Sequence, residues 1–199
     1  MNSQNPFAAW KLHFLFFAFV IGVPTNAQVF QTTSSFPFAR YQHCSAQSLN
    51  DNVLIFGGIN AAASNINSVQ EYNPASDTWT SKANIPVANG LGSSACVKLN
   101  GGEIILFGGS LNSGATPQSN KAFKYNIVTD SWQILNNLPN SIGRTQMSAT
   151  LIDDTTVLLL GGISTISGNL TYPATSYIYT TTTDSYSSAG DLPNLYCLF

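Results

Sequence analysis

Five residue markers recur three times along this chain, and this internal repeat constrains the fold more strongly than any other feature. A glycine pair recurs in steps of 51 and 53 residues, at Gly57-Gly58, Gly108-Gly109 and Gly161-Gly162. An aromatic residue recurs in steps of 53 and 54 residues, at Trp79, Trp132 and Tyr186. Three further residues keep fixed distances from this aromatic. A tyrosine lies seven residues before it, at Tyr72, Tyr125 and Tyr179, and an aspartate lies two residues before it, at Asp77, Asp130 and Asp184. A proline lies seven residues after it, at Pro86, Pro139 and Pro193. Markers that keep register through three copies indicate a repeated structural unit.

Each copy predicts buried strands. An unbroken apolar run of four residues precedes each glycine pair, at 53–56, 104–107 and 157–160. A strand with one solvated face would alternate polar and apolar residues, so we expect these strands to be covered on both faces. The glycine pair ends the run because a residue without a Cβ atom tolerates positive φ and a close neighbour. The tyrosine and the later aromatic are expected on the two strands that follow.

A further strand is predicted before each apolar run, for example over 93–99, where Asn100-Gly101-Gly102 supplies a hairpin turn. Each copy therefore forms four antiparallel strands, called a to d in chain order. Such a sheet, apolar on both faces, must stack on similar sheets, and radial stacking gives a β-propeller. No sustained helical periodicity follows residue 27, so the predicted fold class is all-β, with about three four-stranded antiparallel blades.

This pattern resembles the kelch repeat. The apolar run, the Gly-Gly pair, and the tyrosine and tryptophan at fixed spacing carry the resemblance, which extends over residues 28–199. The third copy departs from it by carrying Tyr186 in place of tryptophan. A propeller of the WD type is disfavoured because the sequence contains no Trp-Asp dipeptide. The resemblance implies blades similar to those in the central domain of galactose-oxidase-like proteins, and protein–protein interaction as the main function.

The repeat register predicts blades one, two and three over 37–85, 86–138 and 139–192. Phe30 precedes Pro37 by seven residues, the same interval as in the complete copies, so residues 28–36 are expected to form an orphan strand d. Residues 193–199 are expected to begin a further strand a. Closed propellers have about four to eight blades, so we expect an incomplete ring, the front part of a longer propeller. The alternative is that two chains assemble into one six-bladed ring.

Residues 1–27 have the pattern of a secretory signal peptide. Lys11 supplies the positive region, residues 14–23 form an apolar stretch, and Thr25-Asn26-Ala27 offers small residues before a cleavage site. The apolar stretch is shorter than the ~20 residues that a membrane-spanning helix needs. We therefore expect a secreted, extracellular protein (periplasmic in a bacterium) without a membrane span, and Asn169 lies in its single N-glycosylation sequon. An uncleaved anchor or a buried helix is the alternative.

Charge and composition exclude several partner classes. Seven Lys and Arg residues against nine Asp and Glu give a formal net charge of −2, and charged residues make up 8% of the chain. Such a surface has no broad basic patch to neutralise phosphates, so no nucleic-acid partner is expected. Apolar residues make up 44% of the chain, which suffices for a folded core.

The long b–c connections are rich in Ser, Asn, Gly and Thr and lie at 59–68, 110–121 and 163–176. Because strand direction alternates, they share one face of the molecule with the d–a connections. Arg40, His43 and Arg144 are placed on that face near the axis, which makes them the candidate ligand-binding residues for a carboxylate or a sugar. The alternative is that the arginines hydrogen-bond to loop carbonyls or pair with nearby carboxylates.

No catalytic, cofactor-binding or metal-binding residues are predicted. After residue 27, His43 is the only histidine, and the sequence has no C-x-x-C pair for a metal. It also has no G-x-S-x-G elbow and no Gly-rich phosphate loop. The aspartates, glycine pairs and aromatics that serve every copy alike are expected to be structural.

Three cysteines, Cys44, Cys96 and Cys197, would meet an oxidising environment in a secreted protein, and their odd number leaves one thiol unexplained. Aligning the copies places Cys44 with Ser94 and Met147, and it places Cys96 at another position of strand a, with Ala46 and Ala149. Small buried thiols are expected there, since a disulfide would require an unusually close approach between neighbouring blades.

Two functions fit these observations. The first is a secreted or cell-surface module that binds a protein or a glycan through its long-loop face, with self-association if the chain is complete. The second is part of a sugar-processing enzyme, because secreted kelch-type propellers include galactose-oxidase-like copper enzymes and sialic acid epimerases. The copper ligands and the tyrosine–cysteine crosslink of the former find no match here, and an acid/base site would have only Arg40, His43 and Arg144 to draw on. We therefore favour binding over catalysis.

Overall fold

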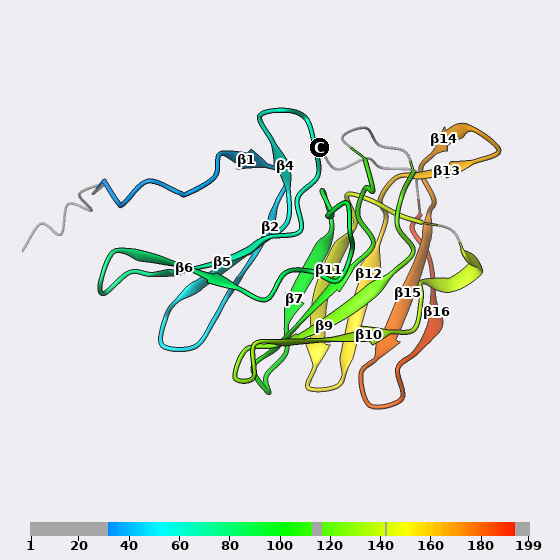
Figure 1. Ribbon diagram of the computed structural model, residues 1–199. Helices are drawn as coiled ribbons and strands as arrows, with labels where there is room; N and C mark the ends of the chain where they lie inside the picture. The colour runs from blue at the N-terminus through cyan, green and yellow to red at the C-terminus, as the bar shows by residue number, and fades with distance from the viewer. Residues whose placement is uncertain (1–31, 113–116, 142, 194–199) are drawn as a thin grey trace, which may run out of the picture. The chain divides into compact units, whose positions relative to one another are not determined.

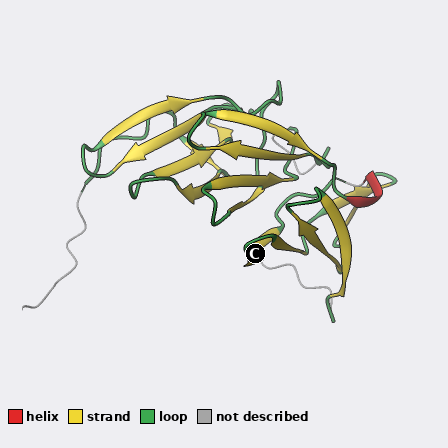
Figure 2. Ribbon diagram, turned by 90° about the horizontal axis from the view of Figure 1, so that it is seen from below, coloured by secondary structure: helices red, strands yellow, loops and turns green. Residues whose placement is uncertain are grey.

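The structure, a computed structural model, describes residues 32–112, 117–141 and 143–193. The chain divides into two compact units, Met1–Thr32 and Thr33–Phe199, and every strand named below belongs to the second. Figure 2 shows strands and loops, with one turn of 3-10 helix at Pro139–Ser141 and no α-helix among the described residues. Within these ranges no helix has the length and apolar character needed to cross a membrane. The predicted all-β class is confirmed.

Three four-stranded antiparallel sheets, one for each repeat, form the blades (Figure 1). Blade 1 consists of β2 (Cys44–Gln47), β3 (Val53–Phe56), β5 (Val69–Asn73) and β6 (Thr78–Lys82). Blade 2 consists of β7 (Ala95–Lys98), β8 (Glu103–Phe107), β9 (Ala122–Asn126) and β10 (Ser131–Leu135). Blade 3 consists of β11 (Ser148–Asp153), β12 (Thr156–Leu160), β15 (Thr175–Thr180) and β16 (Ser185–Asp191). The strands of each blade lie in the sheet in the order a to d, as predicted.

Two short strand pairs lie in segments that the sequence assigns to loops. β1 (Arg40–Tyr41) pairs with β4 (Ile59–Asn60), and β13 (Ser164–Ile166) pairs with β14 (Asn169–Thr171). Ser167 and Gly168, which join the second pair, both have positive φ, as a two-residue hairpin turn of type I′ requires. In the second pair Ser167-Gly168 is a turn signal, but each of these strands has only two or three residues, too few for the alternation that predicts a strand.

The blades pack through two apolar layers, and the middle blade contributes to both. On β8, Ile104 and Leu106 belong to the layer shared with blade 1, whereas Ile105 and Phe107 belong to the layer shared with blade 3. All four side chains are fully buried. Alternate side chains of one strand thus enter different interfaces, which explains the unbroken apolar run. Each such burial stabilises the fold by about 1.5–3 kcal/mol.

The repeated aspartate and the later aromatic residue bind the preceding blade, and the repeated tyrosine donates a hydrogen bond to that aspartate within its own blade. Asp130 of blade 2 accepts hydrogen bonds from the backbone N–H of Ala83, the residue after β6, at 2.8 Å, and from the Tyr125 hydroxyl at 2.6 Å. The indole Nε1–H of Trp132 donates to the carbonyl of the same Ala83 at 2.9 Å. Both backbone groups of one residue are therefore bound across the interface. We call this arrangement the inter-blade clasp.

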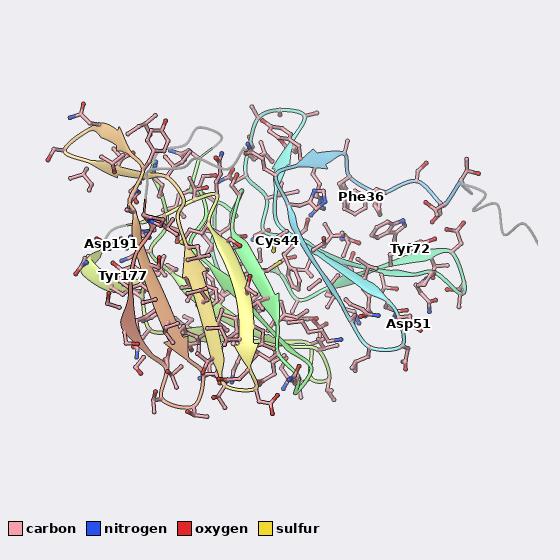
Figure 3. The ribbon with its side chains drawn as sticks, turned by 180° about the vertical axis from the view of Figure 1, so that it is seen from behind. Phe36, Cys44, Asp51, Tyr72, Tyr177 and Asp191 are labelled. Atoms are coloured by element: carbon pink, nitrogen blue, oxygen red, sulfur yellow. The ribbon has the colours of Figure 1, made fainter. Side chains whose placement is uncertain are left out.

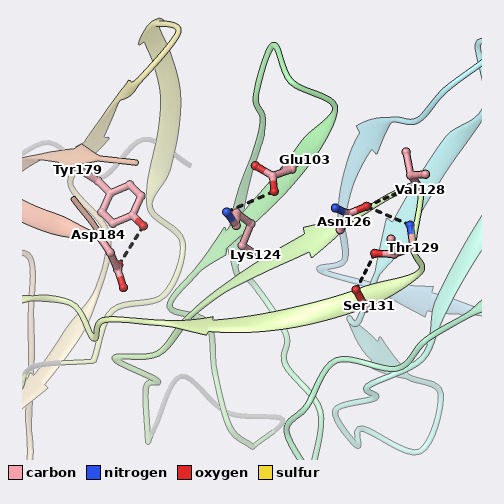
Figure 4. A network of polar contacts seen from close by, with 8 residues as sticks. All are labelled: Glu103, Lys124, Asn126, Val128, Thr129, Ser131, Tyr179 and Asp184. Carbon is pink, nitrogen blue, oxygen red and sulfur yellow. Dashed lines mark hydrogen bonds and ion pairs between the residues drawn. The ribbon is translucent and has the colours of Figure 1, made fainter. Parts of the chain in front are cut away.

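The clasp recurs between blades 2 and 3. Asp184 accepts the Asn136 N–H at 3.1 and 3.0 Å and the Tyr179 hydroxyl at 2.9 Å, a pair that Figure 4 shows. The hydroxyl of Tyr186 donates to the Asn136 carbonyl at 3.0 Å. A tyrosine at the third aromatic position thus reaches the same acceptor as a tryptophan. Burial and the nearby Asp184 carboxylate raise the pKa of Tyr179 and of Tyr186 well above the ordinary tyrosine value, so both hydroxyls keep their donor proton.

In blade 1 the same groups bind the segment that precedes the blade. Asp77 accepts the Ser34 N–H at 2.8 and 3.0 Å and the Tyr72 hydroxyl at 2.7 Å, and Trp79 donates to the Ser34 carbonyl at 3.3 Å. Phe36 packs on Trp79 with ring centroids 4.5 Å apart, and Figure 3 labels Phe36 and Tyr72. Ser34 thus takes the place that Ala83 has at the next interface. Of the predicted strand over 28–36, residues 28–31 lie outside the described residues and residues 32–36 are not a strand.

The glycine pair is required by a close approach of the chain at the end of strand b. A Cβ atom on Gly57 would lie 2.3 Å from the Leu91 carbonyl oxygen, and one on Gly108 would lie 2.2 Å from the Arg144 carbonyl oxygen. Both oxygens belong to the segment that enters the next blade. In turn, the Gly58 N–H donates to the Leu91 carbonyl at 2.8 Å. The predicted close approach of a neighbour to the glycine pair is confirmed.

Candidate functional site

The long b–c loops and the segments that enter the blades brace one another. In the b–c loop of blade 1, the Ile66 carbonyl accepts the Leu91 N–H at 3.2 Å, and Asn65 Nδ2 donates to the Ser110 carbonyl at 2.6 Å. Ser110 and Gly92 exchange two backbone hydrogen bonds of 2.7 and 3.2 Å. These bonds join the loops of blades 1 and 2 into one surface, which we call the loop face.

A cleft of about 650 Å³ opens in the loop face. Its lining comes from three segments: the b–c loop of blade 1, the segment that enters blade 2, and the start of the b–c loop of blade 2, at 63–65, 88–89 and 111–112. Asn65, Asn89, Asn112 and Ser64 supply hydrogen-bonding groups, and the other lining residues are apolar. None of these residues carries a charge, so the cleft suits an uncharged ligand surface with hydrogen-bonding groups.

Arg40, predicted to bind a ligand, donates to its own blade. Its Nη1 donates to the carbonyls of Gly57 at 2.9 Å and Ser68 at 3.1 Å, and its Nη2 donates to the Ser68 hydroxyl at 2.9 Å. The guanidinium carbon also lies 4.7 Å from the ring centroid of Phe36. Arg40 therefore ties the end of strand b to the start of strand c.

Arg144 has the same role in blade 3. It donates to the carbonyls of Gly161 at 3.3 Å and Thr175 at 2.7 Å, and to the Thr175 hydroxyl. Its guanidinium carbon lies 5.0 Å from the ring centroid of Tyr177, and only 5% of the residue is exposed. Burial lowers the pKa of Arg144 from its ordinary value. Both arginines thus hydrogen-bond to loop carbonyls, the alternative that the sequence left open.

His43 is exposed and directly precedes β2. Partial desolvation of its ring and the neighbouring Arg40 charge lower the pKa of His43 from its ordinary value. The structure thus brings His43 near Arg40 in blade 1, whereas the guanidinium of Arg144 is held in blade 3. Over the ranges described, no three His, Cys, Asp or Glu side chains are grouped so that they could hold a metal ion.

Comparison with known proteins identifies the family. The family model described as the Attractin/LZTR1 β-propeller matches residues 24–194. This chain belongs to that family. The match agrees with the blades and clasps of the structure, and the predicted resemblance to kelch-repeat propellers is confirmed.

Two further similarities place this kelch-type propeller among known proteins. It is 29% identical to the Kelch-like protein terF of Aspergillus terreus over 177 residues. The matched region covers 81% of this chain and 36% of that protein. The solved structure entitled "Structure of YjhT" matches with a TM-score of 0.67 at 13% identity, over 79% of this chain and 57% of that one. The second likeness shows the fold alone. The chain spans little more than a third of the curated relative and little more than half of the solved structure.

The asparagines of the cleft are candidates that the sequence pattern does not single out. Asn65, Asn89 and Asn112 come from three different loops and occupy no common position in the repeat. For Asn65 and Asn112 the only sequence signal is the Ser/Asn/Gly/Thr-rich composition of the long loops, and Asn89, in the segment that enters blade 2, has no such signal. Composition therefore indicates the loop face, but only the folded arrangement of the loops indicates the cleft.

Proposed function

We propose that this kelch-type propeller is a secreted or cell-surface binding module that holds a protein or a glycan on its loop face, with the cleft between blades 1 and 2 as the main contact. The observation that carries the proposal is the uncharged, amide-rich lining of the cleft. Asn65, Asn89 and Asn112 offer donors and acceptors from three loops, which suit sugar hydroxyls or peptide amides. A carboxylate would need a free cation, and Arg40 and Arg144 already donate to carbonyls.

One acceptor at the cleft has no partner. The Oδ1 atom of Asn65 is buried and, among the described residues, makes no hydrogen bond, while its Nδ2 holds Ser110. A buried acceptor without a partner costs about 1–3 kcal/mol. A small rotation of this amide toward a ligand hydroxyl or N–H would relieve that cost. This supports binding of a ligand that carries donors.

The proposal that the chain is exported rests on the sequence of residues 1–27, which lie outside the described residues. Asn169 begins β14 and is exposed, so its sequon is accessible to a glycosylating enzyme. Expression in a secreting eukaryotic cell should give a product in the medium that starts at Gln28. A peptide N-glycosidase should increase its mobility, and Thr171→Ala should abolish that shift. Retention of the product inside the cell would contradict secretion.

Binding is tested with the full chain on an array of neutral and acidic glycans and in a selection of displayed peptides. Neutral glycans or uncharged peptides should be retained, and Asn89→Ala with Asn112→Ala should weaken that binding at least tenfold. The matched control is Asn137→Ala, which removes an exposed asparagine outside the cleft and should leave binding unchanged. Equal loss in the control, or binding of acidic ligands alone, would contradict the proposal.

A sugar-processing reaction is the alternative function. It would require Arg40, His43 and Arg144 to act on a substrate. Assays for sialic acid mutarotation and for alcohol oxidation test it directly, and turnover that His43→Ala abolishes would replace binding by catalysis as the function of this face.

A further inference from the structure

Two cysteines face each other across the interface between blades 1 and 2. Cys44 pairs with Phe56 across β2 and β3, so its side chain lies on the same face as Phe56, within the apolar layer shared with blade 2. Cys96 pairs with Leu106 across β7 and β8, and Leu106 belongs to the same layer. The strand registers therefore direct both thiols into one interface.

The contacts agree with the registers. The Cys96 thiol donates a hydrogen bond of 3.4 Å to the carbonyl oxygen of Ser45, the residue next to Cys44. Cys44, labelled in Figure 3, is buried, whereas Cys96 is partly exposed. Burial, and after it the nearby Cys96 thiol, raise the pKa of the Cys44 thiol well above its ordinary value. Cys96 is thus the thiol that a dissolved reagent reaches first.

The neighbouring interface shows that these two positions lie close together in the fold. Ala95 pairs with Phe107 as Cys44 pairs with Phe56, and Ala149 pairs with Leu159 as Cys96 pairs with Leu106. Both alanines belong to the layer between blades 2 and 3. The first strands of adjacent blades therefore approach each other at a site that is filled by two small side chains. In the interface between blades 1 and 2 those two side chains are thiols.

We propose that Cys44 and Cys96 form a disulfide that links blades 1 and 2 when a small-molecule disulfide is present as oxidant. The Cys96 thiolate attacks the oxidant, which forms a mixed disulfide and releases one thiol. The Cys44 thiolate then attacks the sulfur of Cys96 and releases the second thiol. Two protein thiols are oxidised, one oxidant disulfide is reduced to two thiols, and the two protein protons end on those thiols. The site is a covalent crosslink and is independent of ligand binding at the loop face.

Peptide mapping tests the crosslink. The full chain is incubated with oxidised glutathione at about pH 8.5, remaining thiols are alkylated, and the protein is digested with trypsin without reduction. Cleavage after Arg40, Lys82 and Lys98 puts the two cysteines on peptides 41–82 and 83–98, and Cys197 on a third. We expect the first two peptides as one linked species, two hydrogen atoms lighter than their sum, that a reductant separates. Alkylation of both cysteines, or a link to Cys197 instead, overturns the proposal.

Thermal unfolding gives an independent readout. A crosslink that closes a loop of about 50 residues should raise the melting temperature of the oxidised chain by about 5–10 °C over the reduced chain. The variant Cys44→Ala with Cys96→Ala reproduces the alanine pair of the next interface, so it should fold and should melt at the same temperature with and without the oxidant. A rise of equal size in this variant would show that oxidation elsewhere stabilises the chain, and would overturn the proposal.

Discussion

At the scale of the residue, equivalent glycines of the repeat differ in what passes beside them. A Cβ atom on Gly108 would lie 2.2 Å from the Arg144 carbonyl oxygen, whereas the nearest atom to one on Gly161 is a Leu192 side-chain carbon at 4.0 Å. Both glycines have positive φ, 62° and 59°. Alanine in this backbone conformation costs about 1–2 kcal/mol at either position. Only at Gly108 does a clash with rigid backbone add to that strain.

We therefore predict that Gly161→Ala lowers the free energy of unfolding by about 1–2 kcal/mol, whereas Gly108→Ala lowers it by about 4 kcal/mol or more. Equilibrium unfolding in urea measures both losses on the same chain. Equal losses would mean that strain alone determines the glycine requirement and that the passing carbonyl has no part in it.

The arginines show how much of the candidate site can be predicted from the types of residue in the sequence. Arg40 and Arg144 each lie four residues before strand a, and Leu91 takes that position in blade 2. The sequence therefore places two cations at the loops. It does not reveal that Arg144 donates to the carbonyls of Gly161 and Thr175, because backbone acceptors are the same for every residue type and are set by the fold. A cation near a loop face is thus weak support for a ligand site.

At the scale of the element, the observed strand register corrects the alignment of the three repeat copies by one residue in strand a. The alignment placed Cys44 with Ser94 and Met147, one residue away from the observed equivalents, which are Ala95 and Ser148. Strand a pairs with strand b in a fixed register. Equivalent positions of strand a are therefore 51 and 53 residues apart, the same intervals as between the glycine pairs that end strand b. Spacing predicted the strands correctly, but a shift of one residue turns a side chain to the opposite face. For that reason the spacing of the repeat does not predict that Cys44 and Cys96 enter the same interface.

A second feature of the element scale is the charged contact that joins β5 to β6. The Glu71 carboxylate lies 2.8 Å from Lys82 Nζ and accepts a hydrogen bond from the Ser48 hydroxyl. Although burial acts to raise it, the hydrogen bonds from Lys82 and Ser48 and the charge of Lys82 hold the pKa of Glu71 below its ordinary value of 4.5. The unfolded chain therefore binds the proton more tightly than the folded one. The stabilisation is complete above pH 4.5 and is lost as the pH falls through the folded pKa.

Glu71→Gln should accordingly reduce the free energy of unfolding by about 1 kcal/mol at neutral pH, and the difference from the parent chain should shrink on acidification below about pH 4. Urea unfolding at a series of pH values measures it. The matched control is Glu103→Gln, because the pair of Glu103 with Lys124 is longer, at 3.2 Å, and more exposed. Its loss should be smaller, and a loss for Glu71→Gln that stays constant down to pH 2 would contradict the predicted linkage.

At the scale of the whole molecule, the repeat predicts most of the architecture because each interface uses the same residues. The intervals between the tyrosine, the aspartate and the later aromatic residue are the same in every copy. They are kept because Asp130 and Asp184 each bind the residue that follows the preceding blade. The hairpin of β13 and β14 and the cleft of Asn65 lie in loops that the repeat does not constrain. The common scaffold is therefore readable from spacing, whereas the features that distinguish one blade from another are not.

Blade 2 separates two interfaces that share no clasp, so their contributions to stability should add. Asp130→Ala and Asp184→Ala each remove the acceptor of one clasp and should each lower the free energy of unfolding by about 2–3 kcal/mol. In a stack of repeats, stability is approximately a sum over units and nearest-neighbour interfaces. The double variant should therefore lose the sum of the two effects to within about 0.5 kcal/mol.

The variant Asp130→Ala with Tyr125→Phe should lose clearly less stability than the sum of its two single variants, because Tyr125 donates to Asp130 directly. A large coupling between Asp130 and Asp184 would instead show that strain passes through blade 2, so that the three blades respond as one body.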